Sequence, residues 1–223
     1  MMGKIKGFLA SKDVGAIGIG AMIVFIAMVL VAGIAASVLI QTSGRLEMQA
    51  MQTGTETIGE VATGLSVFDI VGRKNTALQY IGITVRPRSG APDIDLNETV
   101  IMISDGTTKA VLTYSNNHHA AQVHTATGQL FNTNTLNWAT LDESSFGVIV
   151  LQDYDTSCQS ATPVINKGDK VILAIRAGVT AVFGQEIPVR TQIFGRVVPE
   201  IGSPGVISFT TPPAYNDVVM DLL

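Results

Sequence analysis

The chain has 223 residues, of which 47% are hydrophobic and only 14% are charged, and its net charge is −4. A mildly acidic chain gives no electrostatic footprint for nucleic acid, so composition argues against nucleic acid as a partner. The single cysteine, Cys158, rules out a disulfide within the chain. Stability must therefore come from the core or from neighbouring chains.

The first predicted element is a long apolar helix. No charged residue occurs from Val14 to Gly44, and this region encloses an apolar run from Ala16 to Ile40. Fifteen of these 25 residues are large and apolar, and the others are Ala, Gly or Ser. As a helix the run spans about 37 Å, enough to cross a bilayer. Because it is apolar on all sides, it must lie in lipid or among copies of itself.

Three interpretations of this run are open on composition alone. A secretory signal peptide would use Lys4 and Lys6 as its basic region and be cut near Ala35-Ala36. Against this, the apolar segment of such a peptide usually has about 7–15 residues. A permanent membrane anchor fits the length of the run. A pilin-like precursor, cut before the run so that the run is kept, fits equally well.

The junction before the apolar run favours the pilin-like precursor. A short basic leader ends at Gly15, whose unhindered backbone suits a protease at the membrane face. The stretch GAIGIGAMIVFIAMVLVAGIAASVLI, which starts at Gly15, resembles the start of archaeal flagellins (archaellins) almost residue for residue. Bacterial type IV pilins usually carry Glu at the fifth position after the cut, whereas this chain has Gly20. That difference favours the flagellin branch of the pilin-like superfamily.

The resemblance implies a route of processing and assembly. A prepilin-type leader peptidase, a membrane aspartyl protease, would cut after Gly15 and leave Ala16 as the first mature residue. The precursor would insert transiently in the cytoplasmic membrane with its basic leader inside. The helix would then pack with many copies of itself, or with related archaellins, in the core of an extracellular flagellum filament used for swimming.

Small side chains in the run suit such packing, because they let helix backbones approach closely. Dispersion must supply the gain, since lipid tails are as apolar as the side chains they surround. We expect the filament-core packing surface to include Ile17, Gly18, Ile19, Gly20, Met22, Phe25, Met28, Ala32, Gly33 and Ala36.

An amphipathic pattern continues beyond the run. Apolar residues recur at helical spacing at Ile58, Val61, Leu65 and Phe68. We expect a helix that reaches about residue 70 and is loosened near Gly44, Gly54 and Gly59. The alternative is two helices with a break at Gln41–Gly44.

After residue 73 the pattern changes to short apolar segments rich in Ile, Val and Thr, separated by turn signals. The segments are Leu78–Val85, Thr99–Ile103, Lys109–Tyr114, Phe146–Leu151, Lys170–Ala177, Pro188–Val198 and Val206–Thr210. Seven such strands predict a β-sandwich. Residues 115–145, rich in Asn, Thr and His, are predicted to form a long exposed loop.

The resemblance extends to the C-terminus and to the fold. The tail GRVVPEIGSPGVISFTTPPAYNDVVMDLL, which starts at Gly195, has close counterparts in archaellin tails. Archaellins carry an immunoglobulin-like antiparallel β-sandwich after the helix, so the expected fold class is α+β. The expected organisation is a leader over 1–15, a filament-core helix over 16–72 and an outer β-domain over 73–223.

No local motif marks a catalytic site. The sequence has no Walker loop, no dinucleotide-binding turn, no CxxC and no HExxH. We therefore expect a structural protein, not an enzyme, without a cofactor.

Two groups of residues could still hold a metal ion. A histidine cluster could form from His118, His119 and His124. Carboxylates two residues apart could offer oxygen ligands to Ca²⁺. Such pairs occur at Asp93 with Asp95 and at Asp153 with Asp155. Some archaellins bind a metal in the outer domain, so a structural cation is one possibility. The other is a solvated loop and surface acid in turns.

Asn97-Glu98-Thr99 is the one Asn-x-Ser/Thr sequon. Archaellins are commonly N-glycosylated, so Asn97 is a candidate glycosylation site. Two other functions remain open alongside the flagellin interpretation. The chain could be the subunit of a non-rotating adhesion pilus, or a membrane-anchored protein whose extracellular domain binds a ligand.

Overall fold

The computed structural model describes residues 3–123, 129–178, 181–185 and 187–223. It consists of two units, Met1–Thr55 and Glu56–Leu223. From Gly3 onwards the first unit is part of a single helix, and the second contains the end of that helix and all the strands of the described residues.

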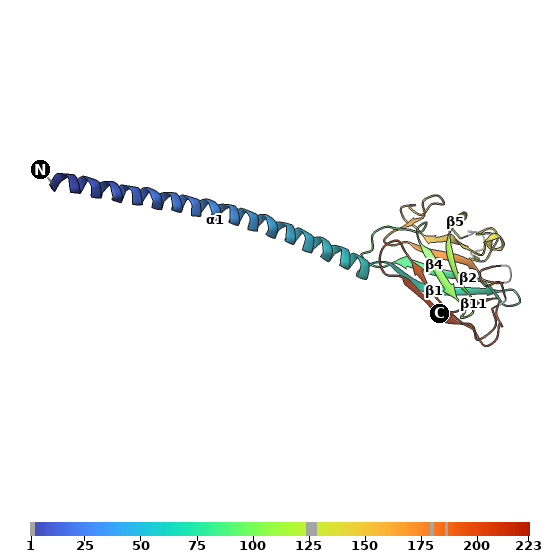
Figure 1. The fold of residues 1–223 in the computed structure, drawn as a ribbon. Coiled ribbons are helices and arrows are strands. Elements are labelled where there is room, and N and C mark those ends of the chain that lie inside the picture. The colour runs from blue at the N-terminus through green and yellow to red at the C-terminus, as the bar shows by residue number, and fades with distance from the viewer. Residues whose placement is uncertain (1–2, 124–128, 179–180, 186) are drawn as a thin grey trace. The chain divides into compact units, whose positions relative to one another are not determined.

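Helix α1 runs from Gly3 to Ala62 (Figure 1). The sequence has no proline before Pro87, so nothing removes a backbone donor inside the helix. Gly44, Gly54 and Gly59 are all helical. The predicted loosening at these glycines and the alternative of two helices are therefore both wrong.

The helix ends earlier than the predicted residue 70. Gly64 has a φ of +117°, a conformation that glycine adopts readily. A side chain there would also collide with Ser203, since a Cβ would lie 2.1 Å from the Ser203 carbonyl oxygen. The Ser203 N–H donates to the Thr63 carbonyl, and the Leu65 N–H donates to the Ser203 carbonyl. The C-terminal tail thus fixes the point where the chain leaves the helix.

Residues expected on the last helical turns belong instead to strand β1, Leu65–Lys74. Leu65 and Ile70 are fully buried in the β-domain. Leu65 and Phe68 keep a spacing of three residues that also suits a helix, but β1 pairs along its length with β2. Sheet pairing, a tertiary effect, overrides the local pattern here.

The β-domain contains ten further strands and a short 3-10 helix, η1, at Trp138–Thr140. The strands are β2 Leu78–Pro87, β3 Ile94–Asp95, β4 Val100–Ser104, β5 Lys109–Ala120, β6 Ser145–Gln152, β7 Val164–Ile165, β8 Lys170–Arg176, β9 Gln192–Val198, β10 Gly205–Thr210 and β11 Val219–Asp221. All seven predicted strands are present, and β1, β3, β7 and β11 were not predicted.

Nine of the strands form a sheet in the order β10-β9-β4-β5-β6-β8-β2-β1-β11, and β3 pairs with β7. Every pair is antiparallel except β5 with β6. Strand β5 joins two layers, because its first residues pair with β4 and its later residues pair with β6. The first layer contains β10, β9 and β4, and the second contains β6, β8, β2, β1 and β11.

The two layers enclose one apolar core. Buried residues of the first layer, such as Ile101 and Ile207, belong to the same cluster as Ile83 and Leu173 of the second. The prediction of a long apolar helix followed by a largely antiparallel β-domain is confirmed. The parallel β5–β6 pair departs from a purely antiparallel sandwich.

A second, smaller cluster covers the outer face of the second layer. Trp138 packs with Ile149 and Ile172, and its indole N–H donates to the Leu130 carbonyl at 3.2 Å. The Arg176 guanidinium anchors the same segment by donating to the Ala139 carbonyl at 2.7 Å. The prediction of an exposed loop over residues 115–145 is therefore wrong for its described part. Its first residues belong to β5, and Trp138 is buried.

Candidate assembly surface

The apolar half of α1 is exposed on all sides within a single chain. Each of the fifteen large apolar side chains from Ile17 to Ile40 is between 52% and 73% exposed. Among the described residues, α1 is the one helix long and apolar enough to cross a membrane. Leaving so much apolar surface in water would cost about 1.5–3 kcal/mol per side chain, so lipid or other protein chains must cover it.

The residues predicted to pack in a filament core all lie on this helix, and all of them are exposed. They are Ile17, Gly18, Ile19, Gly20, Met22, Phe25, Met28, Ala32, Gly33 and Ala36. A Cβ added at Gly18, Gly20 or Gly33 would meet nothing within 4 Å. The fold of the single chain therefore does not require these glycines. Small residues on an exposed helix leave room for close backbone approach by another helix.

The predicted cleavage junction, Gly15-Ala16, also lies within α1. Gly15 is exposed. A glycine weakens a helix by about 1 kcal/mol relative to alanine, so the helix opens more easily at this point than at its neighbours.

An acidic cluster in the β-domain brings together three carboxylates, Asp153, Asp155 and Asp169. One oxygen of each lies within 4.8 Å of the others. The spacing of Asp153 and Asp155 in the sequence pairs these two acids, whereas no local spacing links Asp169 to them. It lies at the turn before β8, 14 residues beyond Asp155 in the sequence, and only the fold brings it to the other two.

Hydrogen bonds hold the acidic cluster in place. Asp153 accepts from the Cys158 N–H at 3.0 Å, and Asp169 accepts from the Asn166 N–H at 2.9 Å. Asp155 accepts from the Ser157 N–H at 3.2 Å. Burial raises the pKa of Asp169, the Asn166 N–H opposes that shift, and the neighbouring carboxylates add to it. The cluster concentrates negative charge and presents the oxygen ligands that hard cations prefer.

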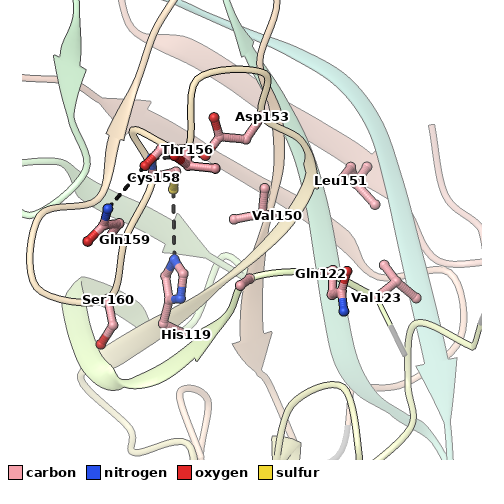
Figure 2. A pocket seen from close by; sticks show the side chains of 11 residues that line it. His119, Gln122, Val123, Val150, Leu151, Asp153, Thr156, Cys158, Gln159 and Ser160 are labelled. Atoms are coloured by element: carbon pink, nitrogen blue, oxygen red, sulfur yellow. Dashed lines mark hydrogen bonds between the residues drawn. The ribbon is translucent and has the colours of Figure 1, made fainter. Parts of the chain in front are cut away.

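Beside this cluster a groove of about 640 Å³ contains His119 and Cys158 (Figure 2). The His119 ring points towards the thiol, and Nε2 lies 3.9 Å from Sγ. Burial raises the pKa of Cys158 to about 12 and lowers the pKa of His119. Both groups are therefore uncharged at neutral pH, and the pair lacks the thiolate that nucleophilic chemistry requires.

The predicted histidine cluster does not converge in its described part. His118 contacts Ser115 Oγ and Thr140 Oγ1 at 3.2 Å and 3.0 Å. His119 follows it on β5 and contacts Cys158 instead. His124 lies outside the described residues.

The remaining predicted site residues lie near β3. Asp93 is exposed, and Asp95 accepts a hydrogen bond from the Asn97 N–H at 2.8 Å, which stabilises a turn. Asn97 is exposed, as an attached glycan would need. Its amide lies 3.4 Å from the Glu98 carboxylate.

An exposed apolar N-terminal helix joined to a β-domain is the architecture of a pilin-like polymer subunit. Comparison with known proteins identifies the family within this class. The family model for archaeal-type flagellin matches residues 15–209. Flagellin B2 of Methanocaldococcus jannaschii is 50% identical over 213 residues, which cover 95% of each chain. Flagellin B3 of Thermococcus kodakarensis is 38% identical and covers 95% of this chain and 98% of its own.

Solved structures agree with the sequence matches. The crystal structure of archaeal flagellin FlaB1 from M. jannaschii has a TM-score of 0.65 and 33% identity, and covers 72% of this chain and 97% of its own. A subunit of the archaeal flagellum of Methanospirillum hungatei shares the fold, with a TM-score of 0.57 and 14% identity over 92% of this chain and 98% of its own. The chain belongs to the archaeal-type flagellin family, and its role is that of a structural filament subunit.

Proposed function

We propose that this chain is a precursor whose residues 1–15 are removed by a prepilin-type leader peptidase before assembly into an archaeal flagellum filament. Ala16 becomes the first mature residue, and α1 from Ala16 to Ala62 forms the filament core. The exposure of every large apolar side chain between Ile17 and Ile40 carries this proposal, because α1 leaves all of them uncovered along its apolar half. The β-domain then forms the outer part of an extracellular filament.

The proposal assigns the membrane a temporary role. Before cleavage, lipid covers the apolar run, and the basic leader stays on the cytoplasmic side. Transfer from lipid to a helix bundle gains little hydrophobic free energy, so close packing must favour the bundle. The exposed glycines at 18, 20 and 33 permit that packing, since none is needed within the chain.

If the outer domain carries the structural cation that the sequence leaves open, the acidic cluster is where it would bind. Three carboxylates whose oxygens lie within 4.8 Å of one another fit a hard cation such as Ca²⁺. Asp153, Asp155 and Asp169 would hold it, and the cation would offset the repulsion among them.

Asn97 is a candidate for N-glycosylation, and peptide mass spectrometry of purified filaments would detect an unmodified Asn97 peptide if that assignment is wrong.

Deletion of the gene, followed by complementation with the full chain, tests the proposed function. We expect electron microscopy to show the filaments lost in the deletion strain and restored by the wild-type chain, together with swimming. Restored filaments without any effect on swimming would indicate an adhesion pilus. A chain that stays in the membrane without forming filaments would indicate an anchored binding protein.

A further inference from the structure

A basic pocket lies on the β-domain of this otherwise acidic chain. It encloses about 420 Å³, and four cationic side chains line it: Arg86, Arg88, Lys167 and Lys170. Arg86 lies near the end of β2 and Arg88 just after it, whereas Lys167 lies in the turn before β8 and Lys170 is the first residue of β8. Asp169 also lines the pocket, which leaves a local charge of +3 in a chain whose net charge is −4.

An exposed aromatic ring lies beside the basic pocket. Phe68 on β1 is 56% exposed, and the Arg86 guanidinium lies 5.2 Å from the centre of its ring. A cation held over an aromatic face remains able to meet an anion from its other side. The pocket and this ring together form a surface that suits an acidic group flanked by apolar side chains.

Such a group is present on α1. The helical segment from residue 41 to 62 carries Glu47, Glu56 and Glu60 against Arg45, a net charge of −2. Glu47 is exposed, and Met51, four residues later on the same helix face, is 66% exposed. Arg45 lies two residues before Glu47 and so does not share its face.

We infer that the basic pocket of one subunit binds the Glu47 segment of α1 from a neighbouring copy in the filament. This inference rests on the proposed function. Glu47 would meet the cations of the pocket, and Met51 would meet Phe68, a favourable sulfur–aromatic contact. The two surfaces differ from each other, so the contact is heterologous. A heterologous contact that does not close into a ring generates a helical filament.

Charge reversal tests this contact, because each chain carries both halves of it. Arg88→Glu reverses an exposed pocket side chain, and Glu47→Arg reverses the helix side chain. In the deletion strain we expect each single variant to lower the filament yield by about tenfold or more, because like charges then meet at the interface. The double variant Arg88→Glu/Glu47→Arg should restore filaments, since the pair is re-formed with the charges exchanged.

Co-expression of the two single variants separates contacts between copies from contacts within one chain. Between copies, the charge-reversed pocket of one variant meets the charge-reversed helix of the other, so mixed filaments should form. Lys109→Glu, an equivalent change at an exposed β5 residue outside the pocket, is the matched control and should assemble as the wild type does. Leader cleavage, followed by gel mobility, should be unchanged in every variant.

Single variants that assemble at the wild-type yield would overturn the inference and leave the proposed function intact. So would a double variant that stays defective, or rescue by the double variant without rescue by co-expression. Accumulation of uncleaved Arg88→Glu precursor would assign the pocket to the membrane stage and would also overturn the inference. Failure of the wild-type chain to form filaments would instead refute the proposed function, and this contact with it.

Discussion

Gly15 is the residue on which the proposed maturation depends. It is exposed and lies inside α1, so a protease must open the helix there to reach the peptide bond. Glycine makes this opening easier, because it has the weakest helix propensity after proline. Cleavage after Gly15 also requires a peptidase that recognises the residues around it, as the family resemblance implies.

We expect Gly15→Val to block cleavage, because a β-branched side chain crowds the bond to Ala16 and stiffens the backbone. The precursor should accumulate in the membrane fraction with its leader attached, which immunoblotting would show as a band of higher mass. Gly44→Val, at a helical glycine far from the junction, is the control for a general effect on helix formation. Normal cleavage of Gly15→Val would contradict the proposed site.

Cys158 is predicted to be unreactive in the folded protein. The thiol is buried, and burial raises its pKa to about 12. Alkylation needs the thiolate, so modification by iodoacetamide at pH 8 should be slow for intact filaments and fast after denaturation, when the pKa returns to about 8.5. Mass spectrometry of the Cys158 peptide measures both rates. Equal rates in the two states would show that the thiol is accessible.

Removal of divalent cations should destabilise the outer domain if the acidic cluster holds one. A cation present at 100 times its dissociation constant contributes about 2.7 kcal/mol. For a chain of this size that corresponds to a fall of about 5–10 °C in the melting temperature when EDTA is added, measured by circular dichroism on purified filaments.

Asp169→Asn tests whether this effect comes from the acidic cluster. The substitution removes one carboxylate at almost constant volume and should abolish the response to EDTA. Asp93→Asn, at an exposed acid outside the cluster, should leave the response unchanged. Identical melting of the wild-type filament with and without EDTA would rule out a stabilising cation.

At the scale of elements, local patterns predict most of the structure. The apolar half of α1 and the seven strands follow from hydrophobic runs and turn residues. The end of the helix does not, because Leu65 keeps a helical spacing and only pairing of β1 with β2 places it in a strand. Strand β11 is too short, at three residues, to leave a local signal.

Long-range packing explains the other features that local patterns do not predict. Asp169 joins Asp153 and Asp155 through the turn before β8, which no local spacing reveals. The segment around Trp138 is rich in Asn and Thr and looks exposed, but its few apolar residues cover Ile149 and Ile172. Strands β6 and β8 are apolar on both faces for this reason. That continuous apolar character was the one available signal that something covers the second face.

Trp138→Ala should destabilise the β-domain, because Trp138 is the largest side chain in the second cluster and is 2% exposed. Deleting a buried aromatic side chain costs about 3–5 kcal/mol in unfolding free energy. Tyr154→Ala removes an aromatic side chain that is 98% exposed and should change the free energy by less than about 0.5 kcal/mol. Urea denaturation followed by fluorescence of the tyrosines measures both. Equal midpoints would show that the cluster does not contribute to stability.

At the scale of the whole molecule, the two units have different roles in a polymer subunit. The helix supplies an apolar surface that a single chain cannot cover, and the β-domain has a closed core of its own. Such a chain is incomplete by itself, because its stable state in water requires neighbours. In the proposed pathway, lipid would cover the helix before assembly and other copies of the chain would cover it afterwards.

The N-terminus of the protein in native filaments tests the central claim most directly. Mass spectrometry or Edman sequencing of purified filament protein should find Ala16 as the first residue, so that residues 1–15 are absent and the apolar run is retained. A start at Met1 would indicate an uncleaved anchor. A start near Ser37 would contradict the account outright, because the helix proposed as the filament core would no longer be part of the subunit.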